Sequence, residues 1–358
     1  MKLHIFNPEH DIALASFHPN FTAPHAGRQL RGDLGFLPAL WAEGGDVVLV
    51  DDVEGAKEHV RHVKNRPRHD IHFMTKEQLR DIASAHLEIS PWGWNPSIKR
   101  ELLKAGIADE LMPTDQRLKE IRDLSSRVWA CHHLQSGVTV VDSLEHLDQR
   151  VRAMENCVLK SPWSSSGRGV RYVSTERWTD DTDRAWASKV IDAQGCVVVE
   201  PYYNKVKDFA MEFEVLADGR ICYRGLSLFH TEKGAYTGSV IASEDVKESL
   251  LAPFVSTAQL RDLRRQVVDI MTRNNIYKVY TGPFGVDMMV YANGDALMVN
   301  PCVELNLRRT MGHVALTLGS HASDRMRLMG IHYDGSHYHL RVRESTHGTE
   351  EPEDYRFT

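Results

Sequence analysis

Two β-rich runs, residues 284–291 and 296–303, flank the dipeptide Asn293-Gly294 and constrain the fold more than any other feature of this chain. Asn-Gly between two such runs is the strongest short-range signal for a β-hairpin, because both residues tolerate the positive φ of a tight two-residue turn. The sequence therefore predicts a hairpin with Asn293-Gly294 as its turn.

The same hairpin predicts a cluster of oxygen-bearing side chains. With that turn Asp287 lies opposite Asn300, and since side chains alternate between the two faces of a strand, Asp287, Glu304 and Asn306 share one face, together with Cys302. Carboxylate and amide oxygens are the ligands that Mg²⁺ prefers. The three residues form either a magnesium site or an ordinary polar strand surface.

Length and composition bound the class of protein. A chain of 358 residues is long enough for two or three structural units, and 42% hydrophobic with 26% charged residues is typical of a globular protein. The net charge is −6 and Lys and Arg are spread along the chain, which argues against a nucleic-acid partner. No apolar run reaches the ~20 residues of a membrane span, and no signal-peptide core is recognisable, so no membrane partner is expected.

The five cysteines are scattered without a CxxC pair, which argues against a disulfide framework and a structural zinc site. The pair His132-His133 lacks a third ligand at metal-binding spacing. We expect a cytoplasmic protein; its oligomeric state cannot be read from the sequence, and a homodimer is one option.

The segment before residue 112 has the pattern of a small α/β unit. Strands are expected at residues 3–6 and 46–51, and Ser97 is expected to cap a helix after a break at residues 91–96. The segment Asn7–Asp11 follows the first strand, where α/β folds bind ligands. It either holds a second substrate or is simply the start of a helix.

Helices and strands continue in the rest of the chain. We expect a helix capped by Ser143, strands at residues 157–160, 170–173 and 197–199, and a helix carrying Leu260, Leu263, Val267 and Ile270.

The loop from Lys160 to Gly169 has the composition of a phosphate cradle. Serines and glycines let the backbone approach an anion, and Lys160 and Arg168 supply positive charge. The loop matches neither the P-loop nor the GxGxxG pattern, so a plain polar hairpin loop is the alternative.

Two further segments are candidates for nucleotide contacts. The strand ending in Glu200-Pro201-Tyr202 either holds a purine or is a domain hinge. Arg308 and Arg309 either stabilise charge on a transferred phosphoryl group or are surface ion-pair partners.

In this order and spacing, these segments resemble the ATP-grasp superfamily over residues 115–330. The resemblance implies an α/β (α+β) class: an ATP-grasp fold of two α+β lobes preceded by an N-terminal Rossmann-like α/β domain. The implied units are residues 1–112 (the N-terminal domain), 113–204 (the small lobe), 205–343 (the large lobe) and 344–358 (an acidic tail).

The resemblance also implies roles for single residues. Contacts to ATP are implied for Arg127, Lys160, Ser165, Ser166, Gly167, Arg168, Gly169, Glu200, Pro201, Tyr202, Asp208 and Lys233. Magnesium, or alternatively Mn²⁺, is implied at Asp287, Glu304 and Asn306, and catalytic roles at Arg308 and Lys160. Arg127 is the candidate for a basic residue on the strand entering the small lobe.

The function implied by the resemblance is ATP-dependent joining of a carboxylate to an amine through an acyl phosphate, with small-molecule substrates such as an amino acid or small peptide. A kinase of the same fold and a nucleotide-binding module without chemistry are the alternatives.

Overall fold

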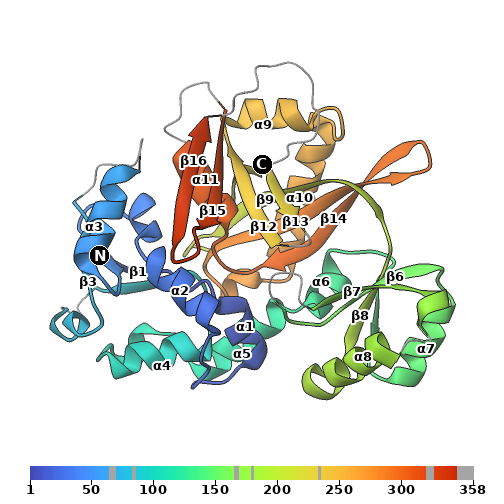
Figure 1. Cartoon of the computed structure of the whole chain (residues 1–358), viewed down its shortest axis with the longest axis horizontal. Coiled ribbons are helices and arrows are strands. Elements are labelled where there is room, and N and C mark those ends of the chain that lie inside the picture. Colours follow the sequence, from blue (N-terminus) through green and yellow to red (C-terminus); the bar gives the residue numbers. More distant parts are fainter. Residues whose placement is uncertain are drawn as a thin grey trace.

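The computed structural model describes residues 1–63, 70–82, 86–164, 169–178, 181–232, 235–319 and 326–344. Within these ranges the strands form four four-stranded sheets with helices packed against them (Figure 1). The predicted mixed α/β class is confirmed.

The N-terminal sheet is parallel, with strand order β3-β2-β1-β4. This is the order of the first four strands of a doubly wound fold. Its strands are β1 (Lys2–Ile5), β2 (Val47–Leu49), β3 (His72–Met74) and β4 (Glu88–Pro91). Its helices are α1 (His10–Ser16), α2 (His25–Asp33), η1 (Leu37–Leu40), α3 (Val53–His62), η2 (Gln78–Asp81), α4 (Pro96–Lys104) and η3 (Asp109–Leu111).

Helix α4 begins two residues earlier than the sequence predicts. The side chain of Asn95 accepts hydrogen bonds from the backbone amides of Ser97 and Ile98, both at 3.0 Å, and Pro96 takes the first helical position, where its missing N–H costs nothing. The prediction of Ser97 as the cap was wrong, because Asn95 is an equally good cap and precedes the proline.

The second sheet, β5-β8-β6-β7, is antiparallel in all its described pairings. Its strands are β5 (Thr139–Val141), β6 (Asn156–Lys160), β7 (Val170–Ser174) and β8 (Val197–Pro201). The associated helices are α5 (Asp115–Leu124), α6 (Arg127–His133), α7 (Leu144–Arg152), η4 (Thr175–Arg177) and α8 (Asp181–Gln194). The hydroxyl of Ser143 caps α7, as predicted.

The third sheet, β10-β9-β13-β14, carries the largest apolar core. Its strands are β9 (Asn204–Val215), β10 (Ile221–Ser227), β13 (Gly282–Asn293) and β14 (Ala296–Asn306). Phe213 and Phe284 stack on its inner face, and Leu260 and Val267 of α10 (Thr257–Arg273) belong to the same core. The apolar stripe predicted for this helix is therefore confirmed.

The fourth sheet, β11-β12-β15-β16, lies beside the N-terminal unit (Figure 1). Helix α11 shares one apolar core with that unit, since Val314 and Leu318 belong to the cluster of Phe6 and Trp92. The remaining elements are β11 (Phe229–Glu232), β12 (Ala235–Ile241), α9 (Glu244–Leu251), η5 (Ile276–Lys278), α11 (Met311–Gly319), β15 (Arg327–Tyr333) and β16 (Tyr338–Glu344). The predicted tail lies outside the described residues, apart from Glu344.

The predicted hairpin is present, but its turn differs. Asn293 pairs with Ala296, so the two-residue loop is Gly294-Asp295, with Gly294 at φ +61°. Glycine at the first loop position is the signature of a type II′ turn, which competes with the Asn-Gly type I′ turn assumed from the sequence.

A bulge then changes the register of the hairpin. Between the pairs Met289↔Asn300 and Asp287↔Glu304, β14 has three intervening residues and β13 has one. Pro301 lies in this stretch, and proline cannot donate a ladder hydrogen bond. The expected pairing of Asp287 with Asn300 was therefore wrong. Two extra residues preserve the alternation of faces, so Glu304 and Asn306 still share the face of Asp287.

The four sheets fall within the three ranges implied by the resemblance, apart from the first residue of β9 and the last residue of β16. We propose the division at residues 112, 204 and 343 on this basis.

Gly93 gives a test of the packing around the first helix. An added Cβ would lie 2.5 Å from the ring of buried His10, whereas at Gly44 it would meet nothing within 4 Å. We expect Gly93→Ala to lower the free energy of unfolding by about 1–3 kcal/mol in urea titrations, and Gly44→Ala to change it by less than ~0.5 kcal/mol. Equal stabilities of the two variants would contradict this packing.

Candidate active site

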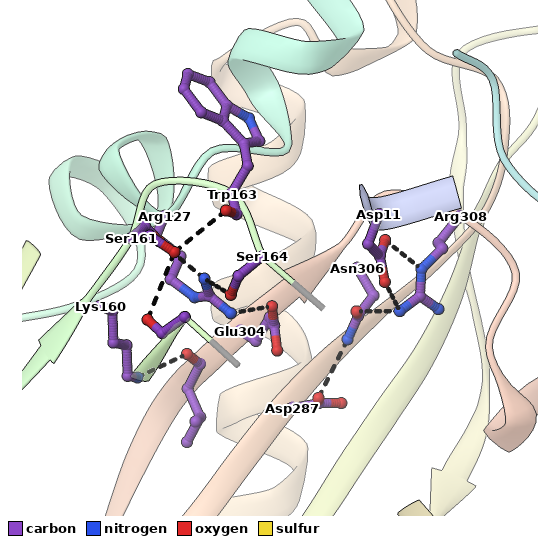
Figure 2. Close-up of polar contacts among 12 residues, drawn as sticks. Asp11, Arg127, Lys160, Ser161, Trp163, Ser164, Asp287, Glu304, Asn306 and Arg308 are labelled. Carbon is purple, nitrogen blue, oxygen red and sulfur yellow. Dashed lines mark hydrogen bonds and ion pairs between the residues drawn. The ribbon is translucent and has the colours of Figure 1, made fainter. Parts of the chain in front are cut away.

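One face of the third sheet is acidic. Glu212 on β9 pairs with Gly285, and Asp287 pairs with Ala210 on one side and with Glu304 on the other. These positions alternate with the apolar ones that fill the core on the opposite face. The three carboxylates therefore lie on one surface, and Asn306 lies beside Asp287 (Figure 2).

Burial and mutual repulsion raise the pKa of two of these carboxyl groups, Asp287 and Glu212. The pKa of Asp287 is raised to about 7, chiefly by removal from water and then by the facing Glu304, while Arg308 opposes the shift. The amide nitrogen of Asn306 donates to Asp287 at 3.1 Å. Such a face binds cations favourably, because a nearby positive charge relieves the repulsion.

Glu212 is the carboxylate that the sequence argument left without a role. It is 2% exposed, and burial followed by repulsion from Asp287 raises its pKa to about 8. Its Oε2 lies 3.0 Å from Nδ1 of His313 but has no hydrogen-bond partner among the described residues. Burial lowers the pKa of His313 to about 3, so at neutral pH this contact is not an ion pair. In the sequence, the one signal for Glu212 is its position four residues after Asp208, because residues an even number apart on a strand share a face.

Arg308 is held by the N-terminal unit. Its Nε and Nη2 donate to the two carboxylate oxygens of Asp11 on α1, both at 2.8 Å, and Nη2 also donates to the side-chain oxygen of Asn306 at 2.9 Å (Figure 2). Burial disfavours the charged form of both residues, but the attraction between them is stronger, so the pKa of Asp11 is lowered and the pKa of Arg308 is raised. Arg308 is thus ionised and aimed at the acidic face.

Arg309 has a different environment. Its backbone amide donates to the carbonyl of Trp92, and its guanidinium lies 4.4 Å from the ring centre of Trp41. Of the two candidate arginines, the structure brings Arg308 to the acidic face and packs Arg309 against the N-terminal unit.

Arg127 joins residues 161–164, the described start of the predicted phosphate loop (the phosphate-loop segment), to the acidic face. Its Nη1 donates to the carbonyl of Ser161 at 2.8 Å and to the hydroxyl of Ser164 at 2.7 Å, and its Nη2 donates to Glu304 at 2.5 Å (Figure 2). The expected strand position was wrong: Arg127 is the first residue of α6, because the hydroxyl of Ser126 caps a helix there.

Lys160 and Glu200 form a buried pair between β6 and β8. The ammonium lies 2.6 Å from Glu200 and donates to the carbonyl of Val303 at 3.2 Å. Pro201 ends β8, and the half-exposed Tyr202 follows it. Lys160 therefore reaches β14, next to Glu304.

The remaining predicted residues are placed as follows. Asp208 lies on the acidic side of β9 and contacts Lys205 at 2.6 Å and Thr231 at 3.2 Å. Gly169 closes the loop, where an added Cβ would overlap the hydroxyl of Ser161. Ser165, Ser166, Gly167, Arg168 and Lys233 lie outside the described residues.

A small cavity of about 20 Å³ lies where the units meet. It is lined by His10 and Asp11 of α1, by Trp163 and Ser164 of the loop segment, and by Glu304 and its neighbours on β14. In the described part of the chain, no three or more His, Cys, Asp or Glu side chains are grouped as a metal site; the predicted set has two carboxylates and an amide. No helix there is long and apolar enough to cross a membrane.

Comparison with known proteins bears on the fold. No family model matches the sequence, and no curated protein matches it significantly. The biotin carboxylase domain of Hydrogenobacter thermophilus 2-oxoglutarate carboxylase, solved with MgADP, ADP and bicarbonate, is 14% identical; the match covers 92% of this chain and 74% of that one, with a TM-score of 0.53. N5-carboxyaminoimidazole ribonucleotide synthetase from Thermus thermophilus is 15% identical, with 92% and 83% covered and a TM-score of 0.50.

The chain has the ATP-grasp fold. Within it, Arg127 and Lys160 bring the phosphate-loop segment next to the acidic face of the third sheet. The ATP-grasp fold expected from the sequence is confirmed, while the roles assigned to single residues stay predictions.

Glu212 provides a test of the electrostatics of this face. Because its pKa is raised from 4.5 to about 8, the unfolded chain binds fewer protons between these values, and wild-type stability falls as pH rises through them. Glu212→Gln cannot ionise and escapes this loss. In urea titrations with EDTA, we expect the free energy of unfolding of the variant, relative to that of the wild type, to rise by a few kcal/mol between about pH 5 and pH 8. The exposed Glu110→Gln is the control, and an equal gain there, or none at Glu212, would refute the assignment.

Proposed function

We propose that this protein is an ATP-dependent ligase that joins a carboxylate to an amine through an acyl phosphate and releases ADP and phosphate. An amino acid or small peptide is the proposed substrate class. One observation carries the proposal: Asp287, Glu304 and Asn306 share a face with Arg308 at its edge, and Arg127 ties Glu304 to the phosphate-loop segment.

Magnesium fits this face. Its donor set is two carboxylates and an amide, burial and then repulsion from Glu304 raise the pKa of Asp287, and a buried oxygen of Glu212 lacks a hydrogen-bond partner among the described residues. Asp287, Glu304 and Asn306 would hold the ion, or Mn²⁺ in its place. Asn306 turns its nitrogen toward Asp287 and its oxygen toward Arg308, so ligation by the oxygen requires its amide to rotate. When bound, the ion neutralises phosphate charge.

The proposed chemistry uses the cations of the chain to position the reacting groups. A carboxylate oxygen attacks the γ-phosphorus of ATP, the bond to the bridging oxygen breaks, and ADP leaves. The amine nitrogen then attacks the acyl carbon, phosphate leaves with the C–O electron pair, and the nitrogen loses its proton. Lys160 and Arg127 flank the phosphate-loop segment, and Arg308 can orient the acid by two parallel hydrogen bonds, the geometry in which it now binds Asp11.

Because Asp11 belongs to the N-terminal unit, its bidentate contact with Arg308 brings that unit into the proposed reaction. A carboxylate already occupies the fork of Arg308, so an acidic substrate must share or replace that contact. Asp11 left free by such a replacement is a natural partner for a substrate ammonium group. A zwitterionic amino acid carries both charges, which supports the proposed substrate class.

Asp287→Asn and Glu304→Gln test the proposed metal ligands. Each removes one negative charge with little change of shape, and we expect ADP release with ATP, Mg²⁺ and substrate to fall at least about a hundredfold. Asp295→Asn, at the exposed tip of the same hairpin, should keep wild-type turnover. Unchanged thermal unfolding would show that the fold survives. Wild-type-like turnover of either site variant would rule out its role as a ligand.

The choice between ligase and kinase needs a product measurement. We expect a screen of amino-acid pairs to show ADP release that depends on both members of a pair, with a condensed product of the summed mass less water. ADP release with one compound, and that compound gaining a phosphate, would favour the kinase. ATP binding without ADP release across the panel would favour the non-catalytic module.

A further inference from the structure

A cleft in the N-terminal unit has no lining residue in common with the site described above. It has a volume of about 610 Å³ and opens between α4, η2 and the segment Pro19–Thr22. The hydroxyl of Ser97 on α4 donates to the carbonyl of Phe21 at 3.3 Å and so joins two of these walls. The volume lies within the ~300–1,000 Å³ of small-molecule sites.

The lining of this cleft is basic, although the chain carries a net charge of −6. Four of its side chains are positively charged (Lys76, Arg80, Arg100 and Lys104) and two are negatively charged (Glu77 and Glu101). Glu101 is already neutralised, because both of its oxygens accept from Arg31, at 2.6 and 3.0 Å, and Lys76 lies 2.9 Å from it. The cleft therefore concentrates positive charge.

Three of the cations have no ion-pair partner within the described chain. Arg80, Arg100 and Lys104 make no salt bridge or hydrogen bond there. Arg100 and Lys104 are four residues apart on α4 and therefore neighbours on its surface, an arrangement that disfavours the helix unless an anion lies between them. Lys104 gains from its place in the last helical turn, but Arg100 lies in the middle of the helix.

The backbone after α4 keeps Arg80 next to this helix. Gly106 has φ +93°, and an added Cβ would lie 3.3 Å from Cγ of Arg80. Glycine suits this position for two reasons: it adopts the positive φ readily, and it leaves room for the aliphatic part of the Arg80 side chain. The turn brings Arg80 from η2 to the end of α4, where Lys104 lies.

We propose that this cleft binds a small polyanion, such as a phosphate ester or a polycarboxylate, at a site separate from the nucleotide. Two guanidinium groups can each bind an anion through two hydrogen bonds, and the two ammonium groups add charge without fixed direction. The volume of the cleft and the negative charge of the whole chain favour a small ligand over a nucleic acid.

The experiment measures anion binding to the full chain by calorimetry at constant ionic strength, with inorganic phosphate, glycerol 3-phosphate and citrate as probes and chloride as the reference. The test variant is Arg80→Glu with Arg100→Glu. The control is Lys119→Glu with Lys189→Glu, which changes net charge equally at exposed positions outside the cleft. We expect at least one probe to bind the wild type and the control alike, and the cleft variant at least about tenfold more weakly.

A second readout locates the bound anion. Acetylation of lysines followed by peptide mass spectrometry should show that the bound probe protects Lys104, while Lys119 reacts as before. Phosphate binding at the nucleotide site would leave Lys104 unprotected. The proposal is overturned if no probe binds more tightly than chloride, if the cleft variant binds like the control, or if Lys104 is not protected. Whether the phosphates or citrate bind more tightly identifies the ligand source.

Discussion

The alternation of side chains on β9, β13 and β14 is the constraint on which the rest of the structure depends. One face must be apolar to bury Phe213 and Phe284, and the other face then carries Glu212, Asp287 and Glu304 at neighbouring positions. Three carboxylates so close repel one another, which is why burial alone does not account for the raised pKa of Asp287. The fold must therefore bring cations to this face: Arg308 follows β14 and is held by Asp11 of the N-terminal unit, and Arg127 comes from α6.

Helix α1 connects those parts. At its start Asp11 binds Arg308, and at its end the carbonyls of Leu14 and Ala15 accept from Arg122, at 3.0 and 3.3 Å. The guanidinium of Arg122 lies 3.6 Å from the ring centre of Trp163, whose indole N–H donates back to the carbonyl of Arg122. A helix of seven residues thus contacts both the acidic face, through Arg308, and the phosphate-loop segment, through Arg122. This explains the role of Asn7–Asp11, which the sequence left open: its last residue is a partner of the site, and Asn7 and His10 anchor it against Gly93 and Asn95.

Local chemistry accounts for the elements that could be predicted from sequence, and non-local contacts account for those that could not. The strand at Val197–Val199 and the Ser143 cap depend on neighbouring residues alone, so pattern and propensity were enough. The change of register near Pro301 depends on which strands pair. The start of α6 depends on the Ser126 cap, which competes with the strand propensity of the residues that follow. The partner of Arg308 is 297 residues away in sequence, and no local pattern contains that contact. The set Asp287, Glu304 and Asn306 was found because a bulge of two residues, unlike one of a single residue, keeps side chains on their face.

The size of the cavity between α1, Ser164 and Glu304 implies movement during any reaction at this face. About 20 Å³ holds roughly one water molecule and excludes an amino acid. A wall must therefore withdraw before a substrate can occupy this cavity between Asp11, Ser164 and Glu304. Neither wall is independent: Arg122 is bonded to α1 and stacked on Trp163, and Arg127 binds both Ser164 and Glu304. Either α1 and the loop segment move as one body, or the stacking of Arg122 on Trp163 is the contact that breaks. The second is less costly for buried charge, because the ion pairs Asp11–Arg308 and Arg127–Glu304 survive it and the losses are one cation–π contact and the hydrogen bond from the Trp163 indole to the carbonyl of Arg122.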